Sequence, residues 1–127
     1  ATLPPFQFES YGDNLARCQR YYYMHAKGSP KPIGIGFYYA GNYCGCQIHC
    51  PTTMRASPAI EDVVGTDYYR CDRSGGNDTF NGFANEAASE NGVQIYVSTG
   101  DASGTAGDAG RVYTNNASSQ LAFTSEL

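Results

Sequence analysis

The residues most suggestive of chemistry are the cysteines, three of which lie in the segment Cys44-Gly45-Cys46-Gln47-Ile48-His49-Cys50. Thiolate and imidazole groups bind zinc, so this segment is a candidate metal site. Its spacing differs from the separated C-x2-C pairs of structural zinc sites, and a strand is the better interpretation. Side chains alternate along a strand, so the three cysteines and Ile48 share one face, where free cysteines pack as small hydrophobic side chains. The odd total of five cysteines also disfavours a fully disulfide-paired framework.

Groups for nucleophilic or acid–base catalysis are sparse. The imidazoles are those of His25 and His49, and no serine lies in a G-x-S-x-G or similar nucleophile motif. We interpret both histidines as strand residues that face water or a neighbouring subunit. Glu61 and Asp62 are adjacent in a predicted strand, so their carboxylates point to opposite faces and do not form a catalytic acid–base pair. The sequence therefore predicts a protein without enzymatic activity.

Oxygen-rich segments offer a second candidate for a metal, which would be calcium. One is the loop from Asp101 to Asp108, and the other contains Asp72, Asn77 and Asp78. Neither matches the D-x-[DN]-x-[DN]-G pattern of a calcium loop, so no motif supports this alternative. We predict that the protein has no cofactor, with calcium as the alternative.

Non-covalent binding is the better-supported activity, because tyrosine combines a flat apolar ring with a polar tip. Tyr68, Tyr69 and Arg70 lie in a polar, glycine-rich region and are the predicted ligand-binding residues, placed to stack against sugar rings. The alternative is that one tyrosine of the pair lies in the core and the other at its rim, because neighbouring strand residues alternate.

Length and composition restrict the classes of protein. A chain of 127 residues suits one domain. Its 11 tyrosines, 15 glycines and lack of tryptophan favour strands and turns over helices. A net charge of -4 disfavours nucleic-acid binding, which needs a cationic face. The longest apolar stretch, Ile33 to Ala40, is too short to cross a membrane, so we expect no membrane insertion.

The elements that must position these residues are mostly short strands separated by Gly, Asn and Ser turns. The predicted strands are Tyr21–His25, Ile33–Tyr39, Tyr43–Cys50, Ala59–Val64, Val93–Val97, Arg111–Thr114 and Gln120–Glu126. The other predicted elements are an extended arm over residues 1–10, a helical turn over Leu15–Arg20 capped by Asp13 or Asn14, and a helical turn over Asn85–Ser89. Loops are predicted over Gly65–Asp78 and Thr99–Gly110, with a short strand at Tyr68-Tyr69 as an alternative within the first. Residues 1–127 are thus predicted to form a single all-β domain, a jelly-roll-like antiparallel β-sandwich with long Gly/Ser/Asn-rich loops.

Three sequence blocks carry a resemblance to a known family. The first is Arg17-Cys18-Gln19-Arg20-Tyr21-Tyr22, an R-C-Q-R-Y-Y signature. The second runs from Ile48 to Pro58, where Met54, Arg55 and Pro58 fall in a P-x-x-M-R-x-x-P pattern. The third, Leu121 to Leu127, is similar to a closing aromatic-x-x-x-E-L, with Thr124-Ser125 in place of the usual small and acidic pair. Together, in this order, the blocks resemble the small C-terminal domains of phage tail-fibre and minor structural proteins.

The resemblance implies a β-sandwich domain on the outside of a virion, assembled in the host cytoplasm and without enzymatic activity. We therefore expect a homotrimeric bacteriophage structural protein that contacts other virion proteins and acts in host attachment, as a tail-fibre tip that binds a host-surface glycan. One alternative is a capsid cement (decoration) protein that stabilises the head. A further alternative is a secreted lectin-like module.

The family brings no established ligand-binding residues, so the matched residues are interpreted as structural. Arg17, Arg20 and Arg55 suit charge-assisted hydrogen bonds to carboxylates or carbonyls. Met54 suits the core or a subunit seam.

Overall fold

The fold is an antiparallel β-sandwich, as the sequence predicts. The computed structural model describes residues 10–98 and 102–125, so Ser10 is the part of the predicted extended arm that it covers. The described elements are α1 (Tyr11–Gln19), β1 (Tyr22–Lys27), β2 (Pro32–Ala40), β3 (Tyr43–His49), β4 (Ala59–Val63), β5 (Tyr69–Arg73), β6 (Gly76–Phe80), β7 (Ala84–Ser89), β8 (Gly92–Val97), β9 (Ala109–Thr114) and β10 (Gln120–Thr124). The all-β prediction is confirmed, whereas the jelly-roll connectivity stays a prediction.

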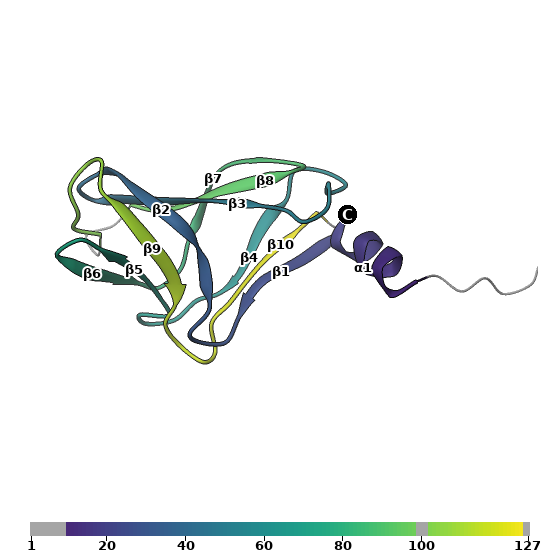
Figure 1. The fold of residues 1–127 in the computed structure, drawn as a ribbon, viewed down its shortest axis with the longest axis horizontal. Helices are drawn as coiled ribbons and strands as arrows, with labels where there is room; N and C mark the ends of the chain where they lie inside the picture. The colour runs from purple at the N-terminus through teal and green to yellow at the C-terminus, as the bar shows by residue number, and fades with distance from the viewer. Residues whose placement is uncertain (1–9, 99–101, 126–127) are drawn as a thin grey trace, which may run out of the picture.

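The strands form two sheets of unequal size. The smaller sheet has three strands in the order β1-β10-β4, and the larger has seven in the order β6-β5-β9-β2-β3-β8-β7. Their inner faces enclose one core, which includes Ala26 of β1 and Phe123 of β10. Helix α1 projects from one end of the sandwich (Figure 1).

Strand alternation places the sulfur atoms of β3 inside, as predicted. Cys44, Cys46 and Ile48 are buried, and Cys50 is half-buried just beyond the strand. Cys71 of β5 joins this core, and every cysteine is a free thiol. A hydrogen bond from Cys44 to Cys71 raises the pKa of Cys44 and lowers that of Cys71. Burial raises the pKa of Cys46 to about 11.

A glycine makes room for one of these sulfur atoms. Gly110 of β9 pairs with Arg73 of β5, and a Cβ atom at Gly110 would overlap the Sγ atom of Cys71. The close packing of this part of the core therefore depends on a residue without a side chain.

The predicted loop over Gly65–Asp78 is wrong from Tyr69 onward, where the hairpin of β5 and β6 begins, and the alternative of a strand at Tyr68-Tyr69 is the better prediction. Tyr69 and Cys71 alternate into the core, although the polar residues around them resemble those of a loop. The hairpin turns at Gly75, whose φ of 89° lies in the left-handed region that glycine adopts easily.

Both helical predictions need correction. Asn85–Ser89 lies in β7, an edge strand whose pairing with β8 overrides its weak hydrophobic pattern. The first helix begins at Tyr11, earlier than predicted, and Ser10 caps it by accepting the N–H of Asp13 on Oγ at 3.2 Å. Asp13 and Asn14, the predicted caps, lie inside the helix.

Candidate binding face

The outer face of the seven-stranded sheet gathers aromatic and charged side chains. We use "outer face" for a set of eleven outward-pointing residues, one of which is Glu86 of β7. The others are Ile35, Phe37 and Tyr39 of β2, Tyr43 of β3, Arg70 and Asp72 of β5, Gln94 and Tyr96 of β8, and Arg111 and Tyr113 of β9. Because outward residues of paired antiparallel strands lie opposite one another, these side chains form one continuous surface.

Four aromatic residues form one end of the outer face, which we call the aromatic end (Phe37, Tyr39, Tyr43 and Tyr96). The rings of Tyr43 and Tyr96 stack with centroids 5.1 Å apart and planes 7° apart. Tyr39 meets Tyr43 edge-on at 5.6 Å. Tyr39 is 77% exposed, and the Tyr43 hydroxyl donates to Oε2 of Glu86 at 3.2 Å. A shallow hollow of about 220 Å³ lies against Phe37, Tyr39 and Tyr43.

Gly45 lies beneath the rings of the aromatic end, and its lack of a side chain lets them pack close to the backbone. It pairs with Phe37 on one side and with Tyr96 on the other. A Cβ atom at this position would lie 3.0 Å from Cζ of Phe37 and 3.2 Å from Cε1 of Tyr43. A larger residue would therefore push both rings away from the sheet.

Two arginines, an aspartate and a tyrosine form the other end, which we call the cationic end (Arg70, Asp72, Arg111 and Tyr113). The guanidinium carbons of Arg70 and Arg111 lie 5.5 and 5.4 Å from the centroid of the Tyr113 ring, within cation–π range. Oδ2 of Asp72 is 3.2 Å from Nη2 of Arg111 and 3.6 Å from Nη2 of Arg70. Pro30 joins the two arginines and Tyr113 in lining a hollow of about 280 Å³.

Strand β2 connects the two ends. Ile35 pairs with Arg111 of β9, and Phe37 pairs with Gly45 of β3. Three interstrand spacings separate β9 from β8, a distance of about 14 Å. The outer face is therefore wide enough for an extended ligand.

The structure separates the three predicted ligand-binding residues. Tyr69 is fully buried, and its hydroxyl donates to the carbonyls of Val63 at 2.8 Å and Gln120 at 2.7 Å, so its prediction as a ligand contact is wrong. Tyr68 is partly buried against the same core, which agrees with the core-and-rim alternative. Arg70 reaches the outer face.

The three blocks that resemble the phage family meet in space. The carbonyl of Arg20 accepts the N–H of Arg55 at 2.8 Å and the hydroxyl of Ser125 at 2.7 Å. Nε of Arg55 donates to the Ser125 carbonyl at 3.1 Å, and Met54 and Pro58 are buried. Arg55 thus donates to a carbonyl and Met54 lies in the core, the placements that their structural interpretation expects. The other matched residues, Arg17, Cys18, Gln19, Tyr21 and Tyr22, lie on α1 or near its junction with β1.

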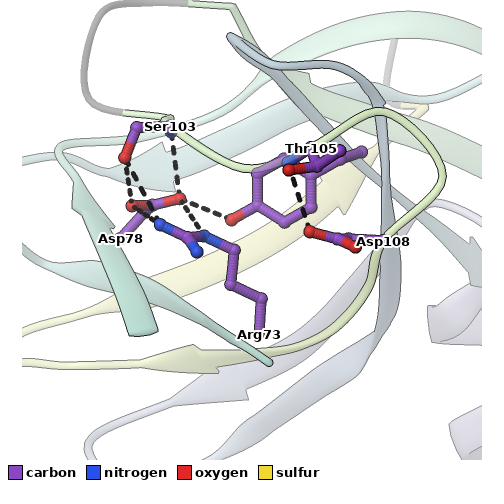
Figure 2. A network of polar contacts seen from close by, with 6 residues as sticks. Arg73, Asp78, Ser103, Thr105 and Asp108 are labelled. Atoms are coloured by element: carbon purple, nitrogen blue, oxygen red, sulfur yellow. Dashed lines mark hydrogen bonds and ion pairs between the residues drawn. The ribbon is translucent and has the colours of Figure 1, made fainter. Parts of the chain in front are cut away.

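A buried carboxylate lies on the inner side of the same sheet. Asp78 accepts hydrogen bonds from the Tyr38 hydroxyl at 2.6 Å and from the N–H and hydroxyl of Ser103, both at 3.1 Å. Nε of Arg73 lies 3.3 Å from the same carboxylate, and Figure 2 shows Arg73 and Ser103 converging on it. Burial by itself would raise the pKa of Asp78, but these hydrogen bonds outweigh it and lower the pKa. This group stabilises the fold.

The two histidines have different surroundings. His25 is partly buried, with Nε2 2.7 Å from the carbonyl of Ile33 and Nδ1 2.9 Å from the hydroxyl of Tyr23. The prediction that His25 faces water or another subunit is therefore wrong, because both ring nitrogens have internal partners. His49 is exposed at the end of β3.

The described residues bring no three His, Cys, Asp or Glu side chains together around a metal position. Of the calcium candidates, Asp72 lies on the outer face and Asp78 lies inside, each beside arginine. Because they occupy opposite faces of the sheet, these carboxylates do not share a cation. Asp108 accepts the N–H of Thr105 at 3.2 Å, and Asp101 lies outside the described residues.

Sequence reasoning missed the aromatic end. The segment Ile33–Tyr39 is apolar on both faces, which is also typical of strands buried on both sides. The useful signal lies in the next strand, where Tyr43 and Gly45 alternate with Cys44 and Cys46. Because Cys44 and Cys46 face the core, Tyr43, which alternates with them, points outward.

Comparisons with family models, with curated proteins and with solved structures found no match to the chain. Among the residues described, no helix has the length and apolar character needed to cross a membrane. Fold and geometry alone define the class, which is an all-β sandwich with an exposed face that is aromatic at one end and cationic at the other.

Proposed function

We propose that the protein is a non-enzymatic structural protein of a bacteriophage virion, a surface-exposed trimeric β-sandwich that attaches to the host by binding a glycan. The observation that carries the proposal is the aromatic end, whose rings stand on the outward side of one sheet. Such rings offer apolar faces on which sugars pack, and the nearby Glu86 and Gln94 offer hydrogen-bonding groups. The resemblance of three sequence blocks to phage tail-fibre domains supplies the virion context.

The chemistry of the outer face favours binding over catalysis. Its groups are aromatic rings, two guanidinium groups, two carboxylates and an amide. Nucleophilic catalysis needs a nucleophile beside a base, and the residues that form the aromatic and cationic ends include neither a thiol nor an imidazole. The function therefore depends on recognition.

Helix α1 supports a contact between subunits. Tyr11 is 81% exposed and Leu15 is 41% exposed, and no residue of this helix is buried. The two side chains are four residues apart and thus lie on one side of the helix. An exposed apolar pair of this kind gains by packing against another chain, so we assign the trimer contact to α1 and glycan binding to the outer face.

A capsid cement protein is the second candidate, and Ile35 is the observation that favours it. This aliphatic side chain is 72% exposed between the two ends of the outer face. Apolar side chains are typical of the centre of a protein–protein interface. Antibodies applied to intact particles separate the candidates, because label at the tail supports attachment and label on the shell supports cement.

The decisive experiment compares two variants that each lose one exposed tyrosine ring. Tyr39→Ala removes a ring of the aromatic end, whereas Tyr11→Ala removes a similarly exposed ring of α1. Glycans are first identified on an array of bacterial oligosaccharides, and affinity per subunit is then measured by calorimetry. We expect Tyr39→Ala to weaken binding about ten-fold, the equivalent of one aromatic contact, and Tyr11→Ala to leave it unchanged.

Sedimentation equilibrium of the same variants tests the trimer. We expect Tyr11→Ala to shift the protein toward monomers and Tyr39→Ala to remain trimeric. A wild-type protein that binds no glycan on the array, or that loses equal affinity in both variants, overturns the attachment function. A monomeric wild-type protein at micromolar concentration overturns the trimer.

A further inference from the structure

The cationic end carries more positive charge than its own carboxylate neutralises. Arg70 and Arg111 share one anion, Asp72. Two guanidinium groups and one carboxylate leave a local excess of one positive charge, although the chain as a whole has a net charge of -4.

The guanidinium of Arg70 has a fixed position, but not all of its N–H donors are engaged within the described residues. Its Nη2 lies 3.6 Å from Asp72, beyond hydrogen-bond distance, while its guanidinium lies over the Tyr113 ring. Within the described residues, its Nε is buried without a hydrogen-bond partner. A guanidinium has five N–H donors in a fixed fork, so the terminal nitrogens of this partly exposed side chain keep donors for a ligand.

Arg111 offers the second donor group from the neighbouring strand. Its side chain is 62% exposed, and one of its terminal nitrogens binds Asp72 at 3.2 Å. The ring of Tyr113 and the carboxylate of Asp72 thus hold both guanidinium groups at one hollow. Two fixed guanidinium groups match the oxygen pairs of carboxylate or sulfate, which they bind with charge-assisted hydrogen bonds.

We propose that the cationic end is a subsite for the anionic group of an acidic glycan, bound by Arg70 and Arg111 while the sugar rings pack on the aromatic end. The inference rests on the proposed function, because it specifies which class of glycan the outer face binds. The aromatic end begins on β2, the neighbour of β9, and extends to β8, about 14 Å from β9, so an oligosaccharide is long enough to contact both ends. The excess positive charge selects acidic over neutral chains.

The test uses three probes that differ in charge. Hexagalacturonate carries carboxylates, its fully methyl-esterified form has the same backbone without charge, and a sulfated galactan hexasaccharide carries sulfates. Calorimetry measures the affinity of the wild type, of Arg111→Gln and of Lys27→Gln. Lys27→Gln is the matched control, because it removes one exposed positive charge from β1, a strand of the smaller sheet.

We expect the wild type to bind an acidic hexasaccharide about ten-fold more tightly than the ester, a preference that Arg111→Gln removes and Lys27→Gln keeps. Arg111→Lys keeps the charge but loses the fork, and we expect it to retain part of the preference. The tighter of the two acidic probes identifies carboxylate or sulfate as the preferred anion.

Equal affinity for acid and ester, or equal losses in Arg111→Gln and Lys27→Gln, overturns the subsite. If the ester still binds and Tyr39→Ala weakens it, the proposed function stands while the acidic subsite fails. If the three probes and the array all give no binding, both fail.

Discussion

The two faces of the seven-stranded sheet each carry a group of arginine, aspartate and tyrosine, and the two groups behave differently. The inner group is Arg73, Asp78, Tyr38 and Ser103, and the outer group is the cationic end. In both, a guanidinium lies over a tyrosine ring, at 6.0 Å inside and 5.5 Å outside. In both, a carboxylate oxygen lies near that guanidinium, at 3.3 Å inside and 3.6 Å outside.

The groups differ in how completely the carboxylate is enclosed. Asp78 is 6% exposed and receives hydrogen bonds from two hydroxyls, a backbone N–H and a guanidinium. Asp72 lies at the surface between two arginines. Hydrogen bonds are stronger in the low dielectric of the interior, whereas exposed ion pairs contribute little to stability. The same residue types therefore stabilise the fold on one face and remain available to a ligand on the other.

Among the changes that test this comparison, we expect Asp78→Asn to lower the free energy of unfolding most. The substitution places an amide where several donors converge and leaves Arg73 without its anion. We expect the free energy of unfolding at pH 7, measured by urea denaturation, to fall by about 3 kcal/mol. A loss typical of an exposed ion pair, below about 1 kcal/mol, would contradict a stabilising role for the inner group.

Lowering the pH protonates the Asp78 carboxylate without replacing its side chain. We therefore expect a smaller loss of stability than in Asp78→Asn. The hydrogen bonds to Asp78 outweigh its burial and lower its pKa in the folded protein. A carboxyl with a lowered folded-state pKa stabilises above its unfolded value of about 3.9, and that contribution is lost as the pH falls through the folded pKa. We therefore expect the free energy of unfolding to fall below about pH 4, more steeply in the wild type than in Asp78→Asn. Parallel pH profiles of the two proteins would contradict this assignment.

Asp72→Asn is the matched change on the outer face and has the smallest expected effect. Its ion pairs involve partly exposed side chains. We expect the free energy of unfolding to change by less than about 0.5 kcal/mol in the same urea experiment. A loss as large as that of Asp78→Asn would remove the distinction between the two faces.

Some strands were predictable because their alternation is local. The cysteine-bearing segment of β3 repeats every two residues, and its buried face is the one that the sequence indicates. The hairpin of β5 and β6 was predicted only as an alternative short strand at Tyr68-Tyr69, because glycine and polar residues surround Tyr69 and Cys71. Strand β5 is extended because it pairs with β9. The residues of β9 lie far along the chain, so the local sequence around β5 does not reveal this pairing.

The candidate site was predictable to a smaller extent. Sequence reasoning selected Tyr69 and Arg70 together, but adjacent strand residues point to opposite faces, and only Arg70 reaches the outer face. The residues that complete the site, such as Phe37, Tyr43 and Arg111, come from strands far apart in the sequence. Nothing local marks them as neighbours.

The sequence by itself determined an all-β sandwich and a buried cysteine face, because side-chain alternation and composition are properties of the chain. The tertiary structure alone decided that Asp78 is enclosed, that Asp72 lies half-buried beside two arginines, and that aromatic and cationic side chains share one sheet face. The physical reason is that alternation assigns neighbouring residues to opposite faces without saying which face is covered. Burial depends on which sheet packs against which, and hence on contacts between distant parts of the chain.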